Sequence, residues 1–118
     1  MYIQGFVVPV PGEAKEAYIK ASQEGWEIFS KLGAIEHVEA WEEDVRDGQY
    51  TDFRKSVEAK DGEIVVFSWV IWPDKQTCEA AHQKMMNGEM DHPEAMPFDG
   101  KRMIFGGFEP VFVAGRND

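Results

Sequence analysis

The sequence predicts an α+β fold in which one antiparallel sheet carries two helices on one of its faces. Apolar runs near the start, in the middle and near the end of the chain are rich in β-branched and aromatic residues, as strands are. After the first run, apolar residues recur at the three-and-four spacing of an amphipathic helix. The full order of strand, helix, strand, strand, helix and strand is that of the split βαβ, or ferredoxin-like, plan.

The first strand and the first helix are predicted from a change of period. Residues 2–10 are predicted to form a strand, which Pro9 and Pro11 with Gly12 bring to an end. Residues 13–32 are predicted to form a helix, and Gly33 is placed to cap its C-terminus. The apolar stripe of this helix consists of Ala14, Ala17, Tyr18, Ala21, Gly25, Ile28, Phe29 and Leu32. Charged residues fall mainly off the stripe, so the opposite face is expected to meet solvent.

The second strand is predicted at residues 34–43, which alternate loosely and end in acidic residues. One side of this strand would hold Ile35, His37, Glu39 and Trp41. Residues 44–51 show no apolar period and indicate an excursion from the sheet, and residues 53–59 are predicted to form a short extra strand. The fold prediction therefore includes an extra strand or excursion between the second and third core strands.

The third strand follows a turn at residues 60–63, where Gly62 can supply a positive φ. Residues 64–72 are an almost continuous run of β-branched and aromatic residues. That composition is typical of a central strand covered on both faces.

The second helix is predicted to begin after Asp74, a suitable N-cap, and to end near Asn87 and Gly88. Its predicted packing face consists of Cys78, Ala81, Met85 and, as a further candidate, Met86. A long loop is predicted at residues 90–101. The last strand is predicted at residues 103–113, and its two adjacent glycines, Gly106 and Gly107, indicate a bulge or a close approach by another backbone or a ligand.

The net charge excludes some partners. The chain has 12 Lys and Arg against 22 Asp and Glu, giving a formal charge of −10. Because the cations are scattered, no phosphate-tracking surface and no nucleic-acid partner are expected. The acidic stretch at residues 36–47 is interpreted as a solvated strand end and loop.

Cellular location and domain number are also predicted from composition. The chain has one cysteine, no basic leader and no apolar run of the length that a membrane span needs. We therefore expect a cytoplasmic protein without a membrane partner. Its 118 residues suit a single domain over residues 1–118. If both helices cover one sheet face, the aromatic side chains of the other face need a second copy, which predicts a homodimer.

Six fragments of the chain resemble the YbaA-like family of small bacterial proteins. They are GFVVPVP, EAWEEDV, TDFRKSV, VVFSWVIWPD, QKMM and MPFDGKRMIFGGFE, in that order. The resemblance implies a ferredoxin-like chain that assembles as a dimeric α+β barrel, in a family without assigned catalytic residues. More remotely, that barrel is similar to those of cofactor-independent antibiotic-biosynthesis monooxygenases, of YCII-like proteins and of the ligand domains of some regulators, which implies a small apolar ligand between sheet and helices.

One polar pocket is predicted from charged turn residues, aromatic walls and a titratable group. Its members are His37, Trp41, Asp52, Arg54, Trp69, Asp99, Lys101 and Arg102. Arginine can bind a carboxylate through two hydrogen bonds and histidine can move a proton near neutral pH, so a small acidic or enolisable compound would suit this pocket. The alternative is that the charged residues form turn and interface ion pairs while both tryptophans pack in the core or the dimer contact.

No metal or cofactor is predicted, because the three histidines form no recognised metal-ligand pattern. Cys78 is interpreted as a packing residue, and His82 as a residue at the rim of its helix. The leading functional hypothesis is a small-molecule pocket between sheet and helices. The alternatives are a small cofactor-independent enzyme of the oxygenase or isomerase type, using His37 or Arg54, and a purely structural or protein-binding dimer.

Overall fold

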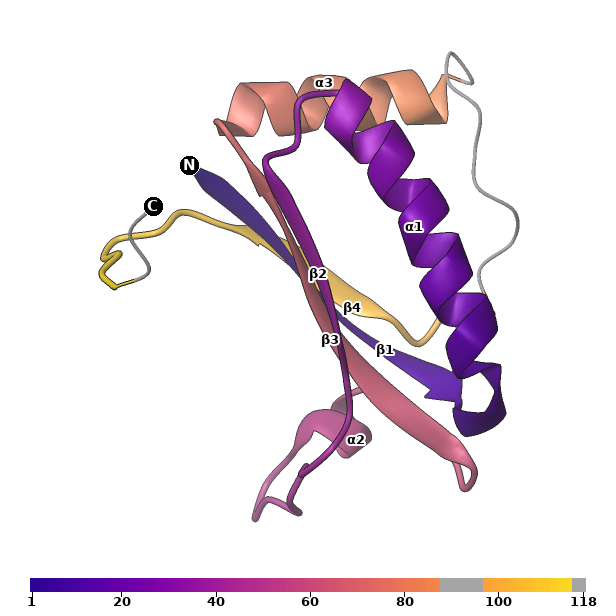
Figure 1. Ribbon diagram of the computed structural model, residues 1–118. Coiled ribbons are helices and arrows are strands. Elements are labelled where there is room, and N and C mark those ends of the chain that lie inside the picture. The colour runs from indigo at the N-terminus through magenta and orange to yellow at the C-terminus, as the bar shows by residue number, and fades with distance from the viewer. Residues whose placement is uncertain (88–96, 116–118) are drawn as a thin grey trace.

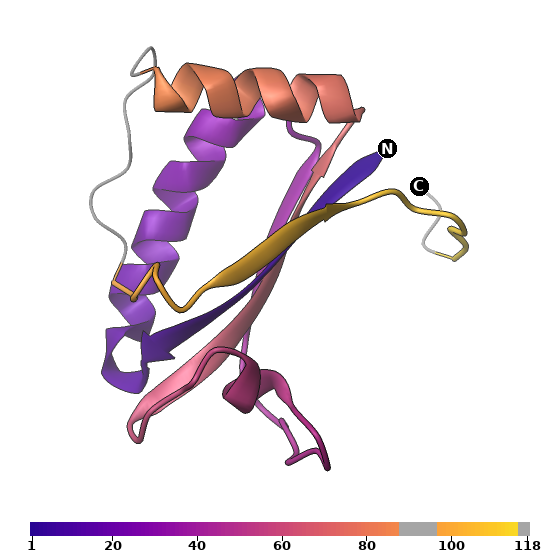
Figure 2. The same ribbon diagram turned by 180° about the vertical axis from the view of Figure 1, so that it is seen from behind.

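The computed structural model describes residues 1–87 and 97–115. The elements are β1 (Tyr2–Pro11), a 3₁₀ turn (Gly12–Ala14), α1 (Lys15–Lys31), β2 (Glu36–Trp41), α2 (Phe53–Ser56), β3 (Glu63–Trp72), α3 (Lys75–Met86) and β4 (Ile104–Phe108). Helices α1 and α3 lie on one side of the sheet, and α2 lies toward the other side (Figures 1 and 2). We call the first side the helix face and the second the open face.

The sheet has four strands in the order β2-β3-β1-β4, and all its pairings are antiparallel. Strands β2 and β4, which follow the long helices α1 and α3 in the chain, lie at the edges of the sheet, and β1 and β3 lie at its centre. This is the arrangement of the split βαβ plan, so the fold class predicted from the sequence is confirmed.

The main core lies between the helix face and the two long helices. Because side chains alternate along a strand, every second residue of β1 and β3 points toward this core. Its buried residues are Val8, Val10, Tyr18, Val66, Val70, Trp72, Cys78 and Ala81. Met86, at the end of α3, is 82% exposed, so its predicted place on the packing face is wrong.

The predicted ends of the helices are confirmed at the level of single hydrogen bonds. Gly33 has a φ of +110° just after α1, and its N–H donates to the Ser30 carbonyl. At the start of α3, the Asp74 carboxylate accepts a hydrogen bond of 2.7 Å from the Thr77 N–H. Gly62, with a φ of +85°, supplies the turn before β3 as predicted.

The extra strand predicted at residues 53–59 is wrong, because this segment contains the short helix α2. The Asp52 carboxylate accepts hydrogen bonds from the backbone N–H groups of Lys55, at 2.7 Å, and Gly48, at 3.1 Å. The bond from Lys55 caps the helix and favours it over an extended chain, and the bond from Gly48 holds the preceding loop against the same carboxylate. The following residue, Val57, is 1% exposed and packs against Val65 at one end of the open face. Residues 44–51 form the predicted excursion.

The prediction that β3 is covered on both faces is wrong for the single chain. Beyond the end that Val57 and Phe53 contact, no helix in the described part of the chain covers its open face, and Phe67 is 45% exposed. The open face is formed by alternate residues of all four strands: Ile3, Val7, Val38, Ala40, Val65, Phe67, Trp69, Ile71, Ile104 and Phe108. A broad apolar sheet surface thus remains without a covering layer in one protomer.

Strand β4 is shorter than predicted. It ends at Phe108, and residues 111–113 lie outside the sheet, each at least 67% exposed. Its pairing with β1 runs without interruption from Ile104 to Phe108, so the predicted bulge is wrong. The group that approaches Gly107 closely is the Tyr2 side chain, and not the backbone or ligand that was predicted. A Cβ on Gly107 would overlap the Tyr2 ring, which is why only glycine fits there.

Within the described residues, no helix is both long enough and apolar enough to cross a membrane.

Candidate functional site

A cavity of about 340 Å³ lies between the helix face and helices α1 and α3. Its walls are mostly apolar, and the aromatic side chains among them are Phe6, Tyr18, Phe29, Trp72 and Phe98. The polar side chains that line it are Gln4, Ser22, His37, Glu39, Ser68 and His82. Ligand sites commonly measure about 300–1,000 Å³ and combine apolar walls with a few polar groups. The cavity has these properties and is the best candidate site in the described part of the chain.

Glu39 is the centre of the first polar group in this cavity. It lies two residues after His37 on β2, so both side chains point to the helix face. The Tyr18 hydroxyl on α1 donates to Glu39 Oε1 at 2.7 Å, and His37 Nε2 lies 2.5 Å from Glu39 Oε2. The His37 side chain is only 7% exposed, and its ring contacts Phe29. The Glu39 carboxyl group, whose side chain is 21% exposed, is therefore held at the wall of a mostly apolar cavity by two neighbours.

The electrostatics of Tyr18 make it a permanent donor in this group. Burial, followed by the charge of Glu39, raises the pKa of the Tyr18 hydroxyl well above its usual range. The hydroxyl consequently keeps its proton. A carboxylate can accept about four hydrogen bonds, so Glu39 still has capacity for a further donor.

Gln4 is the centre of the second polar group. The indole N–H of Trp72 donates to Gln4 Oε1 at 2.8 Å, and Gln4 Nε2 lies 2.5 Å from His82 Nε2. These three residues come from β3, β1 and α3. The chain thus brings together groups that are 68 and 78 residues apart in sequence.

A second hollow of about 560 Å³ adjoins the first and is more open to solvent. The two hollows share Tyr18, Ser22, His37 and Glu39 in their walls. Trp41 lines this second hollow, where its ring contacts Tyr18 and where Lys15 Nζ lies 5.7 Å from its centroid. Two members of the predicted pocket, His37 and Trp41, therefore line the same hollow, four residues apart on β2.

Arg54 and Asp52 lie elsewhere, around α2. Arg54 Nη1 donates to Glu42 Oε1 at 3.0 Å and to the Glu63 carbonyl at 2.9 Å, and Nη2 donates to the Lys60 carbonyl. Asp52 is the helix cap described above. The structure does not bring these two residues to His37.

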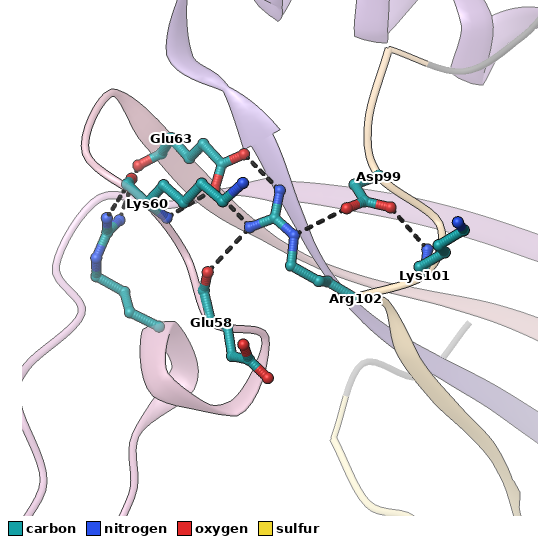
Figure 3. A network of polar contacts seen from close by, with 7 residues as sticks. Glu58, Lys60, Glu63, Asp99, Lys101 and Arg102 are labelled. Carbon is teal, nitrogen blue, oxygen red and sulfur yellow. Dashed lines mark hydrogen bonds and ion pairs between the residues drawn. The ribbon is translucent and has the colours of Figure 1, made fainter.

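Arg102 connects segments that are far apart in the sequence (Figure 3). Its two terminal nitrogens donate to both carboxylate oxygens of Glu63, at 2.8 and 2.7 Å. Its Nε donates to Asp99 at 3.0 Å, and Nη1 also donates to the Glu58 carbonyl at 2.9 Å. The Lys101 backbone N–H donates to the other oxygen of Asp99. This network joins the start of β3 to the turn before β4 and lies apart from the cavity.

We expect Glu63→Gln to lower the melting temperature by several degrees at pH 6, because the bidentate ion pair with Arg102 is lost. That ion pair lowers the Glu63 pKa from 4.5 to about 2. A carboxylate with a lowered pKa contributes stability that is complete above its unfolded value and is lost as the pH falls toward its folded value. The difference between the two proteins should therefore shrink from about pH 4.5 to about pH 2.

Thermal unfolding at a series of pH values, followed by circular dichroism, measures this difference. Other carboxylates with lowered pKa values, such as Asp52 and Asp74, weaken both proteins equally in acid, so the comparison isolates Glu63. A gap between the two melting temperatures that is independent of pH would contradict the proposed cause.

Trp69 lies on the open face, away from the cavity. Its indole N–H donates to Glu36 Oε2 at 3.1 Å, and its ring contacts Phe67. The predicted pocket residues are thus divided among the cavity, the surroundings of α2, the turn before β4 and the open face. Whether any of them binds a ligand stays a prediction.

Sequence reasoning missed Tyr18, Glu39, Gln4 and His82 as cavity residues. The alternation on the second strand did place Glu39 beside His37, but the acidic stretch around it was interpreted as solvated. That interpretation is wrong for Glu39 and also for Glu42, whose side chain is 18% exposed and paired with Arg54. His82 was predicted at the rim of its helix, and it is exposed there while its ring contacts Gln4 in the cavity wall.

Cys78 is 4% exposed in the core, and burial raises the pKa of its thiol. A thiol in such surroundings is a poor nucleophile and a poor metal ligand. Among the residues that the structure describes, no group of three His, Cys, Asp or Glu side chains could hold a metal ion.

The fold and the cavity define a ferredoxin-like α+β protein with an apolar site under its helices. The chain belongs to the family described as "Protein of unknown function (DUF1428)", which matches residues 1–100. It is 48% identical over 112 residues to the uncharacterized protein YbaA of Escherichia coli K12 and to that of Shigella flexneri, covering 93% of this chain and 96% of each relative.

A solved structure supports the same fold. It is a dimeric ferredoxin-like protein from an uncultured marine organism, with a TM-score of 0.51 and 13% sequence identity. The alignment covers 100% of this chain and 98% of that one.

Proposed function

We propose that this protein is a cytoplasmic homodimer that binds a small molecule in the cavity between the helix face and helices α1 and α3. The observation that supports the proposal is the hydrogen-bonded Tyr18–Glu39–His37 group, which is partly buried among apolar walls. A core that served only for stability would have little reason to hold a carboxyl group beside open volume, since empty volume and the partial burial of a polar group both cost free energy.

Binding can be tested with N-phenyl-1-naphthylamine, a neutral dye whose fluorescence rises in apolar surroundings. We expect saturable binding to the purified protein, with a dissociation constant in the micromolar range, because the cavity is apolar and of suitable volume. Gly25→Leu should weaken this binding by at least about tenfold, because Gly25 lines the cavity and leucine would fill part of it.

Gly25→Ala is the matched control. A Cβ at this position would lie 3.7 Å from the Phe29 ring, which is an ordinary contact. Alanine should therefore leave binding nearly unchanged and raise stability by about 0.5–1 kcal/mol, since glycine is unfavourable inside a helix. Equal binding by both variants and the original protein would show that the dye does not enter this cavity.

One observation favours a second candidate, a cofactor-independent enzyme with acid–base chemistry. A carboxylate that contacts a histidine inside a cavity could accept a proton from a bound compound. The guanidinium groups of Arg54 and Arg102 are engaged elsewhere, so this candidate rests on Glu39 and His37 alone. Mass spectrometry of a bound compound before and after incubation distinguishes turnover from simple binding.

The homodimer proposal is supported by the open face and by the dimeric state of the structural neighbour. Exposed Phe67, Ile104 and Phe108 lie on one sheet surface, which a second copy could cover. Light scattering during gel filtration should give a mass near twice 13.4 kDa.

A further inference from the structure

The cavity contains one acidic side chain, and the described residues that line it include no lysine or arginine. A bound carboxylate or phosphate would need a cation or several free donors inside these apolar walls. The ligand class can therefore be narrowed by asking whether either histidine offers a positive charge to an anion.

His82 does not direct its ring Nε2 at a bound anion in this arrangement. The Trp72 indole can only donate, so the Gln4 atom that it contacts must be the amide oxygen. The other amide atom of Gln4 is then Nε2, which can only donate, and it faces His82 Nε2 at 2.5 Å. His82 is exposed, and its Nε2 is directed at this amide nitrogen rather than at the interior of the cavity.

His37 does not offer an unmatched positive charge to an anion either. Its Nε2 is directed at Glu39 Oε2, so any positive charge on this ring is already matched by that carboxylate. The Tyr18 hydroxyl is likewise committed to Glu39. A ligand meets an acceptor at this end of the cavity, because Glu39 retains unused lone pairs and its donating neighbours are occupied.

We propose that the cavity selects a neutral aromatic compound that carries a hydroxyl or N–H donor and that it discriminates against anions. The donor of the ligand bonds to Glu39, and its ring packs against aromatic walls such as Phe29 and Trp72. This inference rests on the proposed function and specifies its ligand. It replaces the acidic compound that the sequence predicted, because that prediction depended on arginines that the fold places elsewhere.

Three probes of similar shape test the proposal by displacement of N-phenyl-1-naphthylamine at pH 7. They are 2-naphthol, which is neutral and donates, 2-methoxynaphthalene, which is neutral and cannot donate, and 2-naphthoate, which is an anion. We expect 2-naphthol to displace the dye at a concentration at least about tenfold lower than either of the others. Weaker binding of the methoxy compound would show that the hydroxyl donor of 2-naphthol contributes to affinity. Weaker binding of the naphthoate would show that the cavity excludes a negative charge.

A variant connects the selectivity to Glu39. Glu39→Gln replaces the carboxyl group with a neutral amide. It should reduce the ratio of the displacing concentrations of 2-naphthoate and 2-naphthol by at least about fivefold. Glu16→Gln is the matched control, because it makes the same substitution at an exposed residue in the first turn of α1 that does not line the cavity, and it should leave the ratio of the two affinities unchanged. The comparison of the three probes on the unaltered protein stands even if a variant fails to fold.

The outcomes separate this inference from the proposed function. If the dye binds and 2-naphthoate displaces it as well as 2-naphthol does, the proposed selectivity is wrong while the cavity remains a binding site. If neither the dye nor any probe binds, the proposed function itself is wrong. If 2-naphthol and its methyl ether bind equally, Glu39 is not the acceptor.

Discussion

Trp72→Ala is expected to lower the free energy of unfolding by about 3–5 kcal/mol, a large part of what a domain of this size has. The Trp72 side chain is 1% exposed and packs with Val70, Cys78 and Ala81 in the core under α3. Its removal would leave a hole beside an existing cavity, which surrounding side chains cannot fill without moving. It would also leave Gln4 Oε1 without its donor.

Urea unfolding followed by circular dichroism measures this loss. Trp72→Phe should cost less, because it keeps most of the aromatic packing and removes only the hydrogen bond to Gln4. Phe112→Ala is the control for loss of an aromatic ring, since Phe112 is 83% exposed, and its effect should stay within about 0.5 kcal/mol. Equal losses for Trp72→Ala and Phe112→Ala would contradict the assignment of the core.

Phe67→Glu is expected to convert a dimer into a monomer of mass near 13.4 kDa. Phe67 lies in central strand β3 on the open face and is 45% exposed in the single chain. Its ring contacts Trp69 on the same strand and Phe53 from α2, so it occupies the middle of an aromatic cluster. A dimer through this face would bring a buried, unpaired carboxylate into each copy, which is strongly unfavourable.

Light scattering during gel filtration at micromolar concentration checks the mass of each variant. Phe112→Glu adds the same charge at an exposed apolar residue of the segment that leaves the sheet after β4 (Figure 1), and it should keep the dimer. A dimer that survives Phe67→Glu, or an unaltered protein that is already a monomer, would contradict an interface on the open face.

The order and the ends of most elements could be predicted because their causes are local. The apolar period of α1, the Asp74 cap and the glycine at residue 33 act over a few residues, and the structure confirms each of them. The alternation of β2 likewise placed His37 and Glu39 on one face. Prediction failed at residues 53–59, where a strand was expected, because the Asp52 carboxylate caps a short helix there instead.

The candidate site could be predicted only in part, because it is made of contacts between distant segments. The sequence by itself determined a four-stranded α+β plan and identified His37 as a member of a pocket. Only the tertiary structure decided that Tyr18, Gln4 and His82 meet there and that Arg102 pairs with Glu63 instead. Periodicity and capping specify which face a residue occupies, but which faces meet depends on how the whole sheet and its helices pack.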